Sequence, residues 1–410
     1  MPDAAAAPGR APLAGAARYH RPMNTSLPII RLKSDRLPGH PWIWSAQVQK
    51  PEQRIAPGTV VEIQDPAGRQ VGHGFWNGHA RIALRLLSNQ PGQVPDADWI
   101  EQRIARAVAL RRDELQLDRH ANAWRVIHSE GDGLSGLVVD RYADTLVIEY
   151  FAAGMWRLRE VIRAALLRHF PDANLYEFAE AHVQKQESFD CRSGDMPEPT
   201  LVEEYGLRFQ AAPGVGHKTG FFADQRDNRR LFAEMARGRR VLDLCCNAGG
   251  FAIHALAGGA ASAVGVDMDP AILEIARGNA ELNGLQPRFE QADIFDWLRQ
   301  ASERGERYDA VILDPAKLTR DRNRIQNALK KYFAMNRAAL EVIEPGGLLL
   351  TCSCTGLVSE ADFHDMLRRV SAHAGREIQI LQSRGAGADH PVRADVPEGR
   401  YLKAVFCKVY

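Results

Sequence analysis

The 410-residue sequence lacks several features that define other classes of protein. It has no run of about 20 apolar residues, which excludes an ordinary membrane-spanning helix. Its six cysteines include no CxxC pair, so we expect neither a zinc site nor a disulfide framework. Because disulfides and an apolar signal segment are both absent, a reducing cytoplasm is the expected compartment, and no membrane partner is expected.

The sequence also lacks a strong excess of either charge, since its formal net charge is +1. Such a balance neither supports nor excludes an RNA partner, because nucleic-acid binding depends on where the basic residues gather. The hydrophobic fraction of 45% and charged fraction of 25% are typical of globular proteins. At about 100–200 residues per domain, the length predicts two or three domains.

Changes in patterning divide the chain into four parts. Residues 1–26 are rich in Ala, Pro, Gly and Arg and predict a disordered tail. Residues 27–95 contain short apolar runs separated by turn residues, which predicts a small β-rich barrel. Residues 96–204 begin with a helical pattern and continue with strand-like runs, which predicts a linker helix and a central α+β domain, with a loop near 185–200.

From residue 205 to 410, apolar strand-like runs alternate with helical segments. That alternation predicts an α/β fold, a doubly wound and mostly parallel Rossmann-like sheet with helices on both faces. The strands are expected at residues 241–244, 263–266, 288–291, 310–313 and 346–351.

The first of these strands contains Asp243 and leads into a loop of small residues before the next helix. Such a loop can bind a ligand at the carboxyl edge of a sheet. The GxGxxG and GxxxxGK[ST] phosphate-binding patterns are absent, so a nucleotide phosphate is not the expected ligand. Within the loop, Asn247 and Gly249 are candidate cofactor-binding residues.

Acidic residues end two further strands. Asp267 lies at the end of the second strand, about 20 positions on, where a carboxylate accepts from ribose hydroxyls. Asp293 ends the third strand and is a candidate partner of an adenine amino group, or a simple helix cap. Together with Asp243, they favour S-adenosylmethionine (SAM), and Met268 beside Asp267 is a further candidate cofactor-binding residue.

Several motifs occur in an order that resembles a known family across nearly the whole chain. They are residues 38–45, 131–142 and 217–229, the Asp243 loop, Asp314-Pro315, residues 352–354, residues 388–391 and residues 399–403. This set resembles the ribosomal RNA large-subunit methyltransferase I family, which makes 5-methylcytosine in RNA. The resemblance implies an N-terminal PUA domain, a central α+β domain and a C-terminal SAM-dependent methyltransferase.

The chain departs from the family pattern at two places. Ala316 stands where a second proline usually follows Asp-Pro, and the loop pair Cys245-Cys246 is unusual. Either difference can alter base stacking or the fit of the cofactor.

The chemistry implied by the resemblance needs a cysteine nucleophile that attacks carbon 6 of cytosine. Cys352 and Cys354 both follow the last expected strand. The related enzymes place a Thr/Ser-Cys-Ser motif shortly after a glycine pair, which favours Cys354 and leaves Cys352 as a packing residue. Asp314 is expected to bond the cytosine edge and to adjoin the cofactor. Lys317 is a candidate to contact a phosphate or to lower the pKa of the thiol, with a solvated lysine as the alternative.

In the same resemblance, the segment 220–229 covers the SAM site. Phe222 is expected near the adenine, and Asp224 or Arg226 near polar parts of the cofactor, unless the segment is only a helix start capped by Asp224.

The expected macromolecular partner is ribosomal RNA of the large subunit, with a homodimer also possible. An aromatic and basic RNA-binding surface is predicted in the β-rich unit, although aromatic residues there are often core. Its members would be Arg31, Lys33, Arg36, His40, Trp42, Trp44 and Phe75. Two alternatives stay open: methylation of an exocyclic amine of guanine or adenine, and an RNA-binding assembly factor with little activity.

Overall fold

The computed structural model describes residues 26–90, 92–212 and 221–410. The predicted tail therefore lies outside the described residues except for Ser26, as does the part of the 217–229 motif before Phe221. Among the described residues, no helix is both long and apolar enough to cross a membrane.

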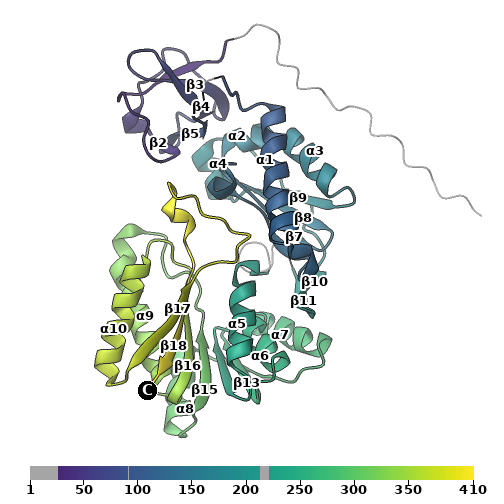
Figure 1. The fold of residues 1–410 in the computed structure, drawn as a ribbon, viewed down its shortest axis with the longest axis vertical. Helices are drawn as coiled ribbons and strands as arrows, with labels where there is room; N and C mark the ends of the chain where they lie inside the picture. The colour runs from purple at the N-terminus through teal and green to yellow at the C-terminus, as the bar shows by residue number, and fades with distance from the viewer. Residues whose placement is uncertain (1–25, 91, 213–220) are drawn as a thin grey trace, which may run out of the picture.

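The N-terminal unit is a five-stranded sheet, as the β-rich pattern predicted (Figure 1). Its strands lie in the order β1-β3-β4-β5-β2, with β1 parallel to β3 and the remaining pairs antiparallel. They are β1 (Ile29–Arg31), β3 (Thr59–Gln64), β4 (Gln70–Trp76), β5 (Ile82–Ser88) and β2 (Trp42–Trp44). The short β2 was not predicted from the sequence.

The central unit is a four-stranded sheet with helices packed on it. The strands are β6 (Ala123–His128), β7 (Leu137–Tyr142), β8 (Thr145–Tyr150) and β9 (Asn174–Phe178). The helices are α1 (Ala97–Ala109), α2 (Ala153–Arg157), α3 (Arg159–His169) and α4 (Ala181–Glu187). The loop predicted near 185–200 was partly wrong, because α4 extends into its start.

A hairpin connects this unit to the next and was also missed. Its strands, β10 (Thr200–Glu204) and β11 (Leu207–Ala211), turn at Tyr205-Gly206, where both residues have positive φ. Val202 and Phe209 are buried against residues of both neighbouring units. The hairpin spans the boundary placed between residues 204 and 205, and that domain division stays a prediction.

The C-terminal unit is a seven-stranded sheet in the order β14-β13-β12-β15-β16-β18-β17. The first five strands are parallel, and β18 is antiparallel to both of its neighbours. This confirms the predicted Rossmann-like fold and adds two strands that were not predicted, β17 and β18. The strands are β12 (Arg240–Leu244), β13 (Ser262–Asp267), β14 (Arg288–Gln291), β15 (Tyr308–Leu313), β16 (Ile343–Ser353), β17 (Ile378–Arg384) and β18 (Lys403–Val409).

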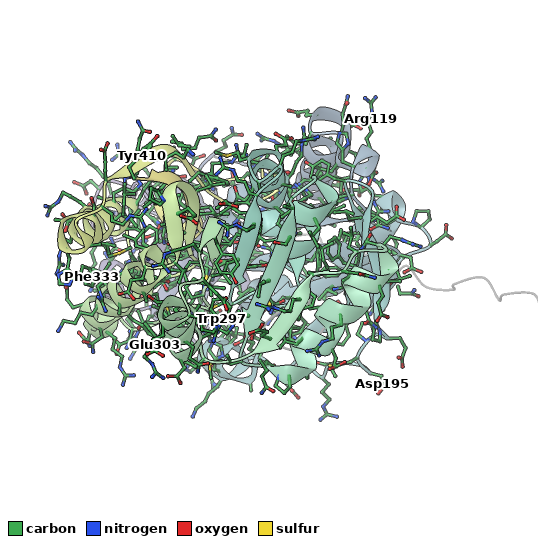
Figure 2. All side chains as sticks on the ribbon, turned by 90° about the horizontal axis from the view of Figure 1, so that it is seen from below. Arg119, Asp195, Trp297, Glu303, Phe333 and Tyr410 are labelled. Carbon is green, nitrogen blue, oxygen red and sulfur yellow. The ribbon has the colours of Figure 1, made fainter. Side chains whose placement is uncertain are left out.

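Helices cover both faces of this sheet (Figure 1). One face carries α5 (Arg226–Met235), α6 (Gly250–Ala257) and α7 (Pro270–Leu282), and the other carries α8 (Ile294–Glu303), α9 (Ile325–Leu340) and α10 (Glu360–Ala374). Side chains fill the space between layers: Trp297 of α8 lies within them, whereas Arg119 and Asp195 project at the periphery (Figure 2). Because the first five strands are parallel, the loops that follow them lie along one edge of the sheet.

Candidate active site

Four candidate residues lie at the carboxyl ends of four adjacent strands. Asp243 is the penultimate residue of β12, Asp267 ends β13, Asp314 follows β15, and Cys354 follows β16. Because the strands are neighbours in the order β13-β12-β15-β16, the sheet places these side chains along one edge. Asp314 also donates its backbone N–H to Leu244 O, at 3.3 Å.

Asp243 is completely buried and only partly satisfied. Its Oδ2 accepts from Ala252 N at 3.1 Å, while its buried Oδ1 has no hydrogen-bond partner. Burial, with the charges of Asp314 and Asp267, raises the pKa of Asp243 well above its usual value. An unpaired buried carboxylate oxygen is costly, so a ligand with an amino group would satisfy it. This arrangement fits SAM.

The loop between β12 and α6 is held in a tight conformation. Cys245, Asn247 and Gly249 all have positive φ, of 61°, 49° and 78°. A Cβ on Gly249 would lie 2.8 Å from Cζ of Phe289, so a larger residue would have to displace that ring as well as adopt the positive φ. Asn247 N donates to Asp267 Oδ2 at 2.9 Å, which ties the loop to the end of β13.

Asp267 also accepts from Asp269 N, at 3.1 Å, and the neighbouring Met268 side chain is 64% exposed. Asp293 caps α8, because its Oδ1 accepts from Phe295 N at 2.8 Å and from Asp296 N at 3.4 Å. The capping role accounts for the residue at this position. A contact of Asp293 with adenine stays a prediction.

Asp314 is held by Gln225, whose Nε2 donates to Oδ2 at 3.0 Å. Burial and the nearby charge of Asp224 raise the pKa of Asp314 to about 7. Asp224 in turn accepts at Oδ2 from the Tyr401 hydroxyl at 2.5 Å, while its buried Oδ1 has no partner. The two acids therefore form a crowded pair next to the cofactor loop, and a large fraction of Asp314 is protonated at neutral pH.

The two cysteines near the end of β16 differ in their surroundings. Cys352 is fully buried in the core with Ala404 and Phe406, and burial raises its pKa well above the usual value. Cys354 is partly exposed, and its thiol points to Pro315 O, 3.9 Å away. Cys354 is thus the cysteine beside the Asp314-Pro315 turn. Lys317, two residues beyond that turn, is exposed.

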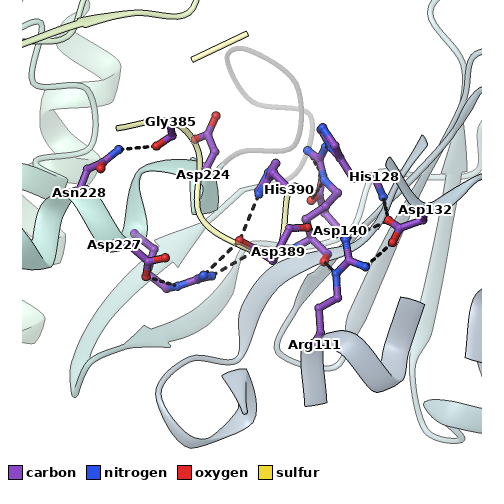
Figure 3. Close-up of polar contacts among 12 residues, drawn as sticks. Arg111, His128, Asp132, Asp140, Asp224, Asp227, Asn228, Gly385, Asp389 and His390 are labelled. Atoms are coloured by element: carbon purple, nitrogen blue, oxygen red, sulfur yellow. Dashed lines mark hydrogen bonds and ion pairs between the residues drawn. The ribbon is translucent and has the colours of Figure 1, made fainter. Parts of the chain in front are cut away.

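The segment that leads into α5 contains one exposed and one buried candidate for cofactor binding, Phe222 and Arg226. Phe222 is 39% exposed, as a side chain that contacts a ligand would be. Arg226 is fully buried, and its guanidinium makes two bonds to Asp389, at 3.2 and 3.1 Å (Figure 3). This ion pair accounts for the burial of Arg226. A contact of Arg226 with the cofactor stays a prediction.

A buried triad beneath the cofactor loop was not identified from the sequence. Arg229 makes a bidentate pair with Glu204, at 2.6 and 2.7 Å, and His254 Nε2 lies 3.1 Å from the same carboxylate. Although burial acts in the opposite direction, Arg229 and His254 lower the pKa of Glu204 to about 2. The triad anchors the β10–β11 hairpin to α5 and α6.

The aromatic and basic surface predicted in the N-terminal sheet is only partly present. Phe75 is 3% exposed and belongs to the core, so its assignment to an RNA-binding surface was wrong. Trp42 donates through Nε1 to Glu130, and His40 lies 3.1 Å from Glu398. Trp44 is 44% exposed and remains available. The other predicted members, Arg31, Lys33 and Arg36, are exposed.

Two family models match this chain. A PUA-like domain model matches residues 35–89, and a model of S-adenosylmethionine-dependent methyltransferases matches residues 179–391. The protein named ribosomal RNA large subunit methyltransferase I from Erwinia tasmaniensis is 35% identical, over 90% of this chain and 95% of its own length. The protein of that name from Aeromonas salmonicida is 37% identical over 89% of this chain and 94% of its own.

The chain belongs to the ribosomal RNA large subunit methyltransferase I family. It is accordingly a SAM-dependent methyltransferase with an N-terminal PUA-like domain. A solved structure of a protein named as a methyltransferase, in complex with S-adenosylhomocysteine, shares this fold with a TM-score of 0.77. The match covers 90% of this chain and 96% of the chain in that structure, and the two sequences are 21% identical. In this family member, Asp243, Asp267 and the loop between β12 and α6 form the candidate cofactor site.

Proposed function

We propose that this methyltransferase forms 5-methylcytosine in large-subunit ribosomal RNA, with Cys354 as a covalent nucleophile and Asp314 beside it. The observation that carries the proposal is the position of Cys354, a partly exposed thiol that contacts the carbonyl of Pro315 at the edge where Asp243 and Asp267 also lie. The names of the relatives, which refer to ribosomal RNA of the large subunit, support the substrate class.

Cytosine carbon 5 is a poor nucleophile, and a thiolate overcomes this by adding to carbon 6. The new bond from Cys354 Sγ to carbon 6 makes the ring an enamine, whose carbon 5 accepts an electrophile. When bound, SAM supplies the methyl group. Loss of the carbon 5 proton to a base then lets the bond from carbon 6 to sulfur break, which regenerates Cys354. The target base has to leave its stack to reach the thiol.

Asp314 suits a supporting role in the addition step. Its pKa is raised to about 7, so a large fraction carries a proton at neutral pH. A protonated carboxyl can donate a hydrogen bond to cytosine N3, where negative charge builds as the thiolate adds. Asp243, with its unpaired Oδ1, and Asp267 are the residues that would hold SAM. Asn247, Gly249, Met268, Phe222 and Asp224 would surround it.

The test is incubation of the protein with SAM and unmodified large-subunit ribosomal RNA, followed by mass spectrometry of the nucleosides. We expect 5-methylcytosine from the wild-type protein and from Cys352→Ala, and none from Cys354→Ala. RNA containing 5-fluorocytidine should form a covalent adduct with the wild-type protein, because fluorine cannot leave carbon 5 as the proton does.

Two outcomes would reject the proposal. Retained methyl transfer in Cys354→Ala, with a methylated amine as product, would favour the exocyclic amine reaction. SAM binding without any transfer to RNA would favour an assembly factor.

A further inference from the structure

The first residue of β18, Lys403, is a buried cation next to the candidate nucleophile. Lys403 is only 4% exposed. In the antiparallel pairing of β16 with β18, Lys403 is directly opposite Ser353, the residue before Cys354. Among the described residues, no carboxylate lies within ion-pair distance of Lys403. Burying an ammonium without an acidic partner costs free energy, so the presence of a lysine at this position calls for a functional explanation.

The ammonium of Lys403 is fixed by backbone carbonyls on both sides of the site. Nζ donates to Thr355 O at 2.7 Å and to Tyr401 O at 2.9 Å. Thr355 directly follows Cys354, so the lysine is tied to the turn that carries the thiol. An ammonium has three donor positions, and these two carbonyls accept from two of them.

The charged groups around Lys403 also indicate an interaction with the Cys354 thiol. Burial lowers the pKa of Lys403 to about 8, and Lys317 acts in the same direction. Cys354 and Glu360 act in the opposite direction, because negative charge on them stabilises the ammonium. This electrostatic coupling is reciprocal, so the ammonium must favour the thiolate form of Cys354 to the same extent.

The other titratable groups around Cys354 do not replace this cation. Tyr332 lies near the Cys354 thiol, and Asp314 directly precedes Pro315, whose carbonyl the thiol contacts. Negative charge on either group disfavours a thiolate. Cys352 is a buried neutral thiol. Lys317 is exposed, so water and salt screen its charge more than that of Lys403.

We propose that Lys403 is a positioning residue that holds Cys354 in its thiolate form for attack on the pyrimidine. The inference rests on the proposed function, in which Cys354 is the nucleophile. Lys403 acts through the thiol and exchanges no proton with the substrate. The motif formed by residues 399–403 thereby acquires a role that the sequence left unassigned.

The experiment measures alkylation of Cys354 by iodoacetamide as a function of pH in the full chain, with the modified peptide quantified by mass spectrometry. Only the thiolate reacts, so the midpoint of the pH profile reports the pKa of the thiol. We expect a wild-type midpoint below the ordinary cysteine value of about 8.5. In Lys403→Met the midpoint should rise by about one pH unit, so that alkylation at pH 7 slows by about tenfold.

Two further variants separate charge from structure. Lys403→Arg keeps the cation and should keep a lowered midpoint. Lys408→Met removes a lysine from the same strand, where Nζ contacts Gly346 O at the far end of the sheet, and should leave the midpoint unchanged. Circular dichroism verifies that each variant is folded.

A wild-type midpoint at or above about 8.5 overturns the inference without any variant. An unchanged midpoint in folded Lys403→Met overturns it too. Because alkylation needs neither RNA nor SAM, the result is independent of the proposed function. A normal thiol midpoint with loss of activity in Cys354→Ala would reject only the role of Lys403. A Lys403-dependent midpoint with full activity in Cys354→Ala would reject only the covalent mechanism.

Discussion

Asp243 is held in an arrangement that costs free energy until a ligand arrives. Its side chain is completely buried, one oxygen has no hydrogen-bond partner, and two other acids lie near enough to disfavour its charge. Residues strained in this way are typical of binding sites, because the ligand relieves the penalty. A substitution that removes this penalty should therefore weaken ligand binding without lowering the stability of the unliganded protein.

We therefore expect Asp243→Asn to bind SAM at least about tenfold more weakly while the unliganded protein is no less stable than wild type. The amide keeps an oxygen for Ala252 N but removes the buried charge. Calorimetric titration with SAM and thermal unfolding without it measure the two effects. Asp96→Asn, at the N-cap of α1 in the central unit, is the control: asparagine also caps helices, so both quantities should change little. A large loss of unliganded stability in Asp243→Asn would contradict this account.

Single positions also show what could be predicted from the sequence. The strand-end positions of Asp243 and Asp267 were predictable because strand ends are visible as apolar runs that stop at a polar residue. Cys354 was chosen over Cys352 on the family resemblance, and the roles of all three residues stay predictions. The burial of Phe75 and the ion pair of Arg226 were not predictable, because local sequence does not reveal which side chains point into the core. Arg226 pairs with Asp389, which is 163 positions away. No local pattern connects residues so far apart.

At the scale of elements, the cofactor loop combines positive φ with close packing. Gly249 has φ of 78°, and an added Cβ would approach Phe289 Cζ at 2.8 Å and Ala276 Cβ at 3.3 Å. The loop thus depends on glycine both for its backbone and for the approach of α7 and β14. The sequence predicted the loop because Gly249-Gly250 follows an apolar strand and precedes a helix.

Gly249→Ala should lower the free energy of unfolding by about 1–3 kcal/mol and weaken SAM binding, because a left-handed alanine strains the loop. The control is Gly278→Ala in the neighbouring α7, where an added Cβ meets nothing within 4 Å. There alanine should stabilise the helix by up to about 1 kcal/mol. Urea unfolding of both variants gives the comparison, and equal effects at the two glycines would contradict the argument.

The elements that the sequence did not predict have weak or misleading patterns. β17 is an edge strand whose residues after Ile378 are exposed, so it shows no alternation of apolar and polar residues. β18 is buried, but a reversed strand inserted next to β16 breaks the alternation of strand and helix used to predict the rest. The β10–β11 hairpin was missed because the boundary between residues 204 and 205 divided its two strands between separate units.

At the scale of the whole molecule, one buried acid joins the central and C-terminal units. Asp389 accepts from Arg226 through its carboxylate and from Arg125 N at 2.9 Å, and its carbonyl accepts from Arg111 at 2.6 Å (Figure 3). Arg111 is itself paired with Asp132 of the central unit, at 2.6 Å. The segment between β17 and β18 thus connects the β6–β7 region to α5, immediately beside Asp224 and the active site.

Asp389→Asn should destabilise the protein by about 3–5 kcal/mol, because it removes the buried counter-charge of Arg226 and leaves the partly exposed Asp227, at 3.3 Å, as its ion-pair partner. Asp395→Asn, which disrupts an exposed pair with Arg393 in the same segment, should cost no more than about 1 kcal/mol. Urea unfolding measures both.

Burial alone would raise the pKa of Asp389, but His390 and Arg226 hold it well below the usual value. A lowered pKa in the folded state stabilises the protein above the ordinary carboxyl pKa, near 4, and this contribution is lost as the pH falls through the folded-state value. The difference between wild type and Asp389→Asn should therefore be full at neutral pH and shrink on acidification below about pH 4. A difference that is independent of pH would show that Asp389 acts by packing and not by charge.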